Sequence, residues 1–274
     1  MRLYQTERGP VLEYDGTFHR IAQGWDPLIN RPDLMAYLLH SAQRPAGENS
    51  VEQVLAPIGS QEVWAAGVTY YRSRTARREE SKVGGGASFY DRVYEAERPE
   101  LFFKAAPWRV RGPGDAIRIR RDARWTVPEP EIALCINARA QIVGYTIGND
   151  VSSRDIEGEN PLYLPQAKIY DGACALGPAV LVSSEPLPPN TAIALRVTRG
   201  GAVVAEGATT FSQMRRDARE LVAYLYRETS FPTGCVLLTG TGIVPPDEFT
   251  LQPGDDITID VPAIGTLRNT VAAS

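Results

Sequence analysis

Short runs of strand-forming residues dominate the hydrophobic pattern of the chain, and few stretches follow the spacing of a helix. Residues 11–21 carry Asp15 and Gly16 between two such runs, which is typical of a β-hairpin. Residues 33–43 follow Pro32 and form a predicted helix with one apolar face. This face contains Leu34, Met35, Leu38 and Leu39.

The remainder of the chain predicts a mixed sheet with few helices. A second helix is expected in residues 213–227, with Ser212 as its N-cap. Strands are expected at residues 116–120, 131–136, 142–147, 179–182, 192–198, 236–239 and 257–261. Many strands without a regular alternation of strand and helix favour an α+β fold. We predict a small N-terminal α/β unit in residues 1–57 and a larger domain in residues 58–274.

Residues 72–97 depart from this pattern. They are charged, poor in aliphatic side chains and interrupted by three consecutive glycines. A loop of this length in a compact domain is usually a lid, a binding loop or a disordered segment. The sequence therefore favours a mobile surface segment here.

Composition excludes several classes of protein. The net charge of -4 and the isoelectric point near 5.4 argue against binding to nucleic acid or to anionic membrane surfaces. The chain has no run of about 18 uncharged apolar residues, so no membrane span is expected. Three scattered cysteines without a CxxC pair predict neither a disulfide framework nor a zinc–thiolate site. We expect a cytoplasmic protein.

Lysine is rare in this chain. Of the 29 basic residues, only Lys82, Lys104 and Lys168 are lysines. An amine can lose its proton or act as a compact point charge, which a guanidinium cannot do. Each lysine is therefore a candidate for chemistry, and the alternative is an ordinary surface residue.

The motifs that are missing narrow the chemistry further. The sequence has no GxGxxG after a strand, no GxxxxGK[ST], no GxSxG and no HExxH. Nucleotide binding and serine-hydrolase chemistry therefore have no support. The two histidines, His19 and His40, both lie in the predicted N-terminal unit, where packing or surface exposure is expected rather than a role as general base.

Two carboxylates stand close together at the start of a predicted strand. Glu129 and Glu131 are two positions apart, so their side chains leave the same face about 7 Å apart along the backbone. Such a pair repels unless a cation lies between the two groups or one of them keeps a proton. Pro128 and Pro130 flank Glu129 and indicate a sheet edge or bulge that is open to solvent. The alternative is a solvated strand edge that binds nothing.

A third carboxylate and an amine follow. Asp150 ends the next predicted strand, and Lys168 lies in a stretch bounded by prolines. Three carboxylates suit Mg²⁺, and a neighbouring ammonium would stabilise negative charge on a substrate oxygen. The alternative is that Asp150 is a turn residue that forms a surface salt bridge with Lys168.

Several motifs, in this order, resemble the fumarylacetoacetate hydrolase superfamily. They are GVTYY from Gly67, RPELFFK ending at Lys104, EPEIALCI from Glu129, the run from Gly144 to Pro178, and LLTGTG ending at Gly242. The resemblance spans most of residues 60–274. Residues 152–172 are most similar to the 2-keto-3-deoxy-pentonate dehydratases. Those enzymes remove water from 2-keto-3-deoxy-D-arabinonate, or from its xylonate-derived equivalent, to give 2-oxoglutarate semialdehyde.

The resemblance implies a fold, a cofactor and a site. It implies a mixed β-sheet rolled into a barrel-like catalytic domain, and a homo-oligomer, either a dimer or a tetramer. It places Mg²⁺, or Mn²⁺ or Ca²⁺, at Glu129, Glu131 and Asp150, with Lys168 beside the ion. Glu100 falls where the dehydratases are expected to carry a catalytic glutamate. Glu100 and Lys168 are the predicted catalytic residues, and the sequence leaves open which of them removes the C3 proton of the substrate.

The resemblance also suggests contacts with a small-molecule 2-oxo acid. Thr241 is expected to hydrogen-bond the substrate carboxylate, and Ser73 or Arg72 the hydroxyls of the sugar acid. Ser73 stands where hydrolases of the superfamily carry the water-activating histidine of GxNYxxH, and a dehydration does not need that base.

Two alternatives stay open at this point. The first is an acylpyruvate or fumarylacetoacetate hydrolase, or an oxaloacetate decarboxylase, on the same metal site. The second is a metal-dependent protein that binds oxo acids without catalysis.

Overall fold

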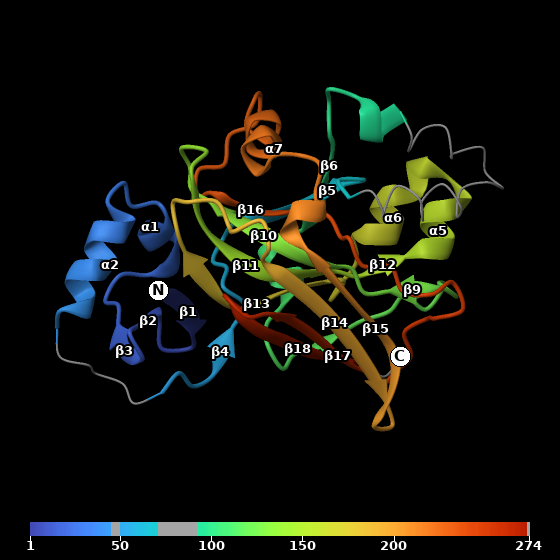
Figure 1. The fold of residues 1–274 in the computed structure, drawn as a ribbon, viewed down its shortest axis with the longest axis horizontal. Helices are drawn as coiled ribbons and strands as arrows, with labels where there is room; N and C mark the ends of the chain where they lie inside the picture. Colours follow the sequence, from blue (N-terminus) through green and yellow to red (C-terminus); the bar gives the residue numbers. More distant parts are fainter. Residues whose placement is uncertain (45–49, 71–91, 273–274) are drawn as a thin grey trace.

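Two packed sheets form the body of the protein in the computed structural model, which describes residues 1–44, 50–70 and 92–272 (Figure 1). The large mixed sheet has the order β3 (Thr17–Arg20), β2 (Val11–Tyr14), β1 (Arg2–Thr6), β13 (Cys174–Val182), β11 (Ile142–Asp150), β10 (Pro130–Ile136), β16 (Cys235–Leu238), β5 (Glu62–Gly67) and β6 (Glu100–Ala105). Two short strands, β4 (Val54–Leu55) and β7 (Val110–Arg111), pair with β1 and β13.

The second sheet lies against one face of the first. It has the order β15 (Ala202–Thr210), β14 (Ala192–Arg199), β17 (Asp256–Val261), β18 (Gly265–Val271) and β8 (Ala116–Ile117). A separate ribbon joins β9 (Thr126–Val127) to β12 (Ser152–Ser153). Contacts of β10, β11 and β13 with β14, β17 and β18 show that the two sheets face each other.

Five labelled α-helices flank the sheets, and residues 92–95 form a further helical turn. The labelled helices are α1 (Trp25–Ile29), α2 (Leu34–Ala42), α5 (Arg154–Glu159), α6 (Leu164–Lys168) and α7 (Ala218–Leu225). Short 3-10 turns occupy Pro107–Arg109, Pro161–Tyr163 and Phe211–Gln213. Figure 1 shows α1 and α2 with the N-terminal strands at one end of the molecule and α5 and α6 at the other. None of the helices in the described part of the chain is long and apolar enough to span a membrane.

The alternation of side chains along β10 explains how one strand serves both the core and a site. Ile132, Leu134 and Ile136 are fully buried in the core between the two sheets. Glu131 and Ala133 point to the opposite face of the same strand, because successive residues of a strand alternate. That second face is also buried, against residues of β5, β13 and β16.

The large sheet is strongly curved. β10, β16 and β5 lie between β11 and β6, so a flat sheet would hold β11 and β6 about 19 Å apart. Nevertheless, the Lys104 Nζ on β6 lies 2.5 Å from the Asp150 Oδ1 on β11. The sheet must therefore curl until the two strands face each other across its concave side.

These sheets and helices confirm the α+β class and the mixed sheet. Closure into a barrel is not found, because the strand order of the described residues has two ends, at β3 and β6. The N-terminal hairpin joins the large sheet through β1 and β13, with Leu3 opposite Val180. The domain boundary at residue 57 stays a prediction.

The structure confirms the predicted hairpin and the first predicted helix and corrects the second. Asp15 and Gly16 have φ angles of 50° and 73° in the turn between β2 and β3, as a tight hairpin requires. The helix α7 begins at Ala218 rather than after Ser212, because Asp217 is its N-cap and accepts hydrogen bonds from two backbone N–H groups. The expected loop at 72–97 lies outside the described residues as far as position 91.

We predict that Lys104→Met lowers the free energy of unfolding of the metal-free protein by about 3–5 kcal/mol, because Asp150 loses a buried cation. Urea unfolding in the presence of a chelator measures the change. Arg196→Met is the control, since Arg196 and Glu206 form an exposed pair at 3.6 Å whose loss should cost less than about 1 kcal/mol. Equal losses in the two variants would contradict the structural role of Lys104.

Candidate metal centre and active site

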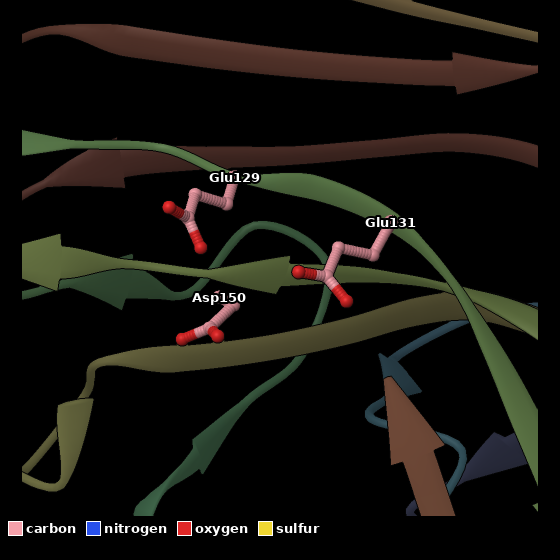
Figure 2. Close-up of side chains that lie close together, drawn as sticks. All are labelled: Glu129, Glu131 and Asp150. Carbon is pink, nitrogen blue, oxygen red and sulfur yellow. The ribbon is translucent and has the colours of Figure 1, made fainter. Parts of the chain in front are cut away.

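Three carboxylates converge on the concave side of the large sheet. Glu129 immediately precedes β10, Glu131 is the second residue of that strand, and Asp150 ends the neighbouring antiparallel strand β11. The Asp150 N–H donates to the Glu129 carbonyl at 3.0 Å, which sets these two residues opposite each other. All three residues are buried, and each offers an oxygen within 4.8 Å of the others (Figure 2).

The prediction that Glu129 and Glu131 lie at a sheet edge or bulge open to solvent is wrong. The strand β10 lies inside the sheet, between β11 and β16. Pro130 is tolerated there because it is the first residue of the strand, where its missing N–H disrupts no ladder. Glu129 and Glu131 are 3% and 2% exposed, so the solvated strand edge is also excluded.

Lys168 at the end of α6 closes one side of the carboxylate cluster. Its Nζ donates to the Glu129 Oε2 at 2.6 Å, the Asp150 Oδ2 at 3.1 Å and the Ser152 Oγ at 2.6 Å. The lysine is 1% exposed, so the alternative of a surface salt bridge is wrong. A buried ammonium at this position counters negative charge at the centre of the site.

Two further buried cations pair with Asp150 and Glu129. Lys104 lies 2.5 Å from the Asp150 Oδ1 and also donates to the backbone carbonyls of Val151 and Lys168. The Arg154 Nη2 donates to the Glu129 Oε1 at 2.8 Å. The scarcity of lysine had marked Lys104, but no pattern in the sequence singles out Arg154.

Glu131 has the least cationic support of the three. It accepts a hydrogen bond from the Gly240 N–H at 2.6 Å. Burial and the negative charges of Asp150 and Glu129 raise its pKa well above the usual range, against the opposing effects of Lys168 and Gly240. The charged form of Glu131 is therefore disfavoured at this position.

The turn at Gly240 requires glycine. Its φ is +90°, and a Cβ at this position would lie 2.0 Å from the Thr69 Oγ1. Only a residue without a side chain brings its N–H this close to Glu131. The neighbouring Thr241 is buried beside this turn, and its hydroxyl donates to the Ile243 carbonyl at 3.2 Å.

The residues of the cluster fit a hard divalent cation. All three candidate ligands are carboxylates, which Mg²⁺, Mn²⁺ and Ca²⁺ prefer over sulfur or nitrogen ligands. Lys104, Lys168 and Arg154 form their ion pairs with Glu129 and Asp150, and burial raises the pKa of Glu131. A divalent ion held by Glu129, Glu131 and Asp150 would supply positive charge beside Glu131.

Glu100 lies on the strand that carries Lys104. It is the first residue of β6, and residues two apart on a regular stretch of strand share a face, so Glu100 and Phe102 point the same way. The Lys168 Nζ lies 5.7 Å from the centre of the Phe102 ring. The face of β6 that carries Glu100 is therefore turned toward the carboxylate cluster.

The remaining candidates are placed as follows. Ser73 and Arg72 lie outside the described residues. His19 is on β3 and His40 on α2, and β2, β1 and β13 separate β3 from β11 in the sheet. Because the chain has two histidines, neither of which belongs to this cluster, the site has no imidazole to activate water.

Comparisons with known proteins show which proteins the chain resembles. The chain is 50% identical over 216 residues to a protein of Haloferax volcanii described as a probable 2-keto-3-deoxyxylonate dehydratase, covering 78% of this chain and 73% of that protein. It is 45% identical over 217 residues to the 2-dehydro-3-deoxy-D-arabinonate dehydratase of Saccharolobus solfataricus, with the same two coverages of 78% and 73%.

A solved structure is similar over nearly the whole chain. It is a 2-keto-3-deoxy-D-arabinonate dehydratase in complex with magnesium and 2,5-dioxopentanoate, with a TM-score of 0.85, 36% identity and coverage of 99% of both chains. The profile of the family described as fumarylacetoacetate (FAA) hydrolase C-terminal matches residues 73–272. The chain therefore belongs to the fumarylacetoacetate hydrolase family.

Proposed function

We propose that the protein is a magnesium-dependent dehydratase that removes water from a 2-keto-3-deoxy-pentonate derived from arabinonate or xylonate. The product is 2-oxoglutarate semialdehyde, which is 2,5-dioxopentanoate. The observation that carries this proposal is the buried group of Glu129, Glu131 and Asp150 with the Lys168 ammonium against it. The likeness to dehydratases of this substrate class supports the choice of reaction.

Glu129, Glu131 and Asp150 would hold the metal ion. When bound, the ion supplies Lewis-acid polarisation of the 2-oxo group, which makes the C3 protons of the substrate more acidic. The burial of all three ligands keeps bulk water out of this position, and electrostatic interactions are stronger where water is excluded.

Lys168 and Glu100 perform the proton chemistry in this proposal. A proton leaves C3 and a hydroxyl group leaves C4, so that a double bond forms between C3 and C4 and one water is released. The Lys168 ammonium stabilises the negative charge that develops on the 2-oxo oxygen. Glu100 transfers a proton between C3 and the departing hydroxyl, directly or through a water molecule. The double bond then moves from C3–C4 to C4–C5, as C5 loses a proton and C3 gains one. The resulting C5 enol takes up a proton at C4 and releases one from its hydroxyl group, which gives the semialdehyde.

Other features expected from the sequence belong to the same proposal. Thr241 contacts the substrate carboxylate, and Ser73 or Arg72 the sugar-acid hydroxyls. The enzyme works in the cytoplasm as a homo-oligomer. The absence of a histidine from the site supports dehydration over hydrolysis of a carbon–carbon bond, because such a hydrolysis needs a base to activate water.

A turnover assay on the metal-loaded protein tests the proposed function. Five-carbon and six-carbon 2-keto-3-deoxy acids, an acylpyruvate and oxaloacetate are offered with Mg²⁺ and, separately, with a chelator. We expect release of the semialdehyde from the five-carbon acids, which stops with chelator and returns with excess Mg²⁺. Cleavage of the acylpyruvate or decarboxylation of oxaloacetate in place of dehydration would favour the alternative enzymes. Binding of the acids without turnover would favour a binding protein.

We predict that Glu100→Gln lowers kcat by about 10²–10⁴-fold, because the variant cannot transfer a proton. Lys168→Met should lower kcat by about 10²–10³-fold through the loss of charge stabilisation. Both variants should still bind Mg²⁺, since the three ligands are intact. The exposed Glu159 on α5 provides a matched control, and Glu159→Gln should retain full activity. Normal kcat in either site variant would remove that residue from the mechanism.

We predict that Mg²⁺ affinity rises with pH toward the raised pKa of Glu131 and levels off above it, because the ion must displace the proton of this carboxyl. Between the ordinary and the raised pKa, the metal-free folded state binds more protons than the unfolded chain. The contribution of Glu131 to stability is therefore full at low pH and falls as the pH rises through this window.

Calorimetry in buffers with different ionisation enthalpies measures the protons released by metal binding. Glu131→Gln should abolish this proton release and weaken the binding of Mg²⁺. An affinity that does not change with pH, with no proton released, would contradict the assignment of Glu131.

A further inference from the structure

Arg216 ties the segment before β6 to the base of α7. Residues 92–95 form one helical turn, and the carbonyls at its end need hydrogen-bond donors from elsewhere. The Arg216 Nη2 donates to the carbonyls of Val93 at 3.0 Å and Ala96 at 2.6 Å, and its Nη1 donates to the Glu97 carbonyl at 3.0 Å. One guanidinium therefore holds three carbonyls at the C-terminal end of this turn.

Burial and additional hydrogen bonds distinguish these contacts from an incidental contact at the surface. Arg216 is 8% exposed, and it also contacts the Glu220 carboxylate on α7 at 3.2 Å. A second hydrogen bond connects the same two segments, because the Tyr224 hydroxyl donates to the Glu97 Oε1 at 3.1 Å. A cation at the C-terminal end of a helical turn is also favoured by the partial negative charge of its free carbonyls.

Glu100 lies only three residues beyond Glu97. Between them, Pro99 is buried and has a fixed φ, so the connection from the held carbonyls to the start of β6 is short and stiff. The Glu100 side chain lies over Gly67, its partner on β5, where an added Cβ would come within 2.1 Å of the Glu100 Oε2.

The residues that follow β5 also contact the segment that contains Arg216. The Arg215 N–H donates to the Thr69 carbonyl at 3.0 Å, two residues beyond Gly67. Tyr70 forms an isolated β-bridge with Met214. Residues 214–216 therefore fix both strands that surround the Glu100 carboxylate.

We propose that Arg216 is a positioning residue for Glu100. It makes no contact with the three candidate metal ligands or with Lys168 among the described residues. It acts through the carbonyls of Val93, Ala96 and Glu97. The position of these carbonyls determines where β6 begins and in which direction the Glu100 side chain points. This inference rests on the proposed role of Glu100 as the proton-transfer group.

The test compares Arg216→Met and Arg216→Lys with a control on the adjacent helix α7. Arg219→Met is the control, because Arg219 is exposed and forms no ion pair within the described residues. Four quantities are measured on the full-length protein: kcat, KM, the Kd for Mg²⁺, and hydrogen–deuterium exchange of residues 98–104. Arg216→Lys keeps the charge but cannot reach three carbonyls with a planar fork.

We expect Arg216→Met to lower kcat by about 10- to 100-fold, because a misplacement of about 1 Å costs as much as 10²-fold. Both KM and the Kd for Mg²⁺ should stay within about threefold of the parent. Exchange should increase at residues 98–104 and stay unchanged in β10 and β11. Arg216→Lys should fall between parent and Arg216→Met, and Arg219→Met should match the parent.

Two results would overturn the inference. One is a kcat for Arg216→Met equal to that of Arg219→Met. The other is a loss of Mg²⁺ affinity in proportion to the loss of kcat, which would mean that the whole site is disturbed. If the parent protein shows no dehydration at all, the proposed function has failed. In that case the exchange measurement alone decides whether Arg216 fixes the start of β6.

Discussion

Three buried carboxylates can be held within 4.8 Å of one another only if positive charge is supplied at the same place. Lys104, Lys168 and Arg154 supply it from three different parts of the chain, on β6, α6 and α5. Glu129 and Asp150 each pair with two of these cations, whereas Glu131 keeps a raised pKa. The cations match the carboxylates in number, but among the described residues their ion pairs go to Glu129 and Asp150, and a divalent ion would supply positive charge at Glu131.

The curvature of the large sheet makes this charge balance possible. It brings Lys104 on β6 across to Asp150 on β11, although β10, β16 and β5 separate the two strands in the sheet. The same strand then carries Glu100 toward the cluster, so one element supports a candidate metal ligand and presents the proposed proton-transfer group. The fold and the chemistry thus depend on the same buried ion pairs.

Local patterns in the sequence predicted the parts of this arrangement that local chemistry determines. The hairpin at Asp15 and Gly16 and the strands that carry Glu131 and Asp150 are present because turn chemistry and apolar runs act over a few residues. The solvent-open edge was wrong, because a proline at the first position of a strand looks the same in the sequence as one at an edge. The inward position of Lys104 could not be predicted, since it results from the curl of the whole sheet.

Anomalous diffraction from a crystal soaked with Mn²⁺ tests the central claim most directly, because it locates the ion without relying on turnover. The account predicts one strong peak within about 2.5 Å of an oxygen from each of Glu129, Glu131 and Asp150. A peak at another position, with these carboxylates still paired only to lysine and arginine, would contradict it.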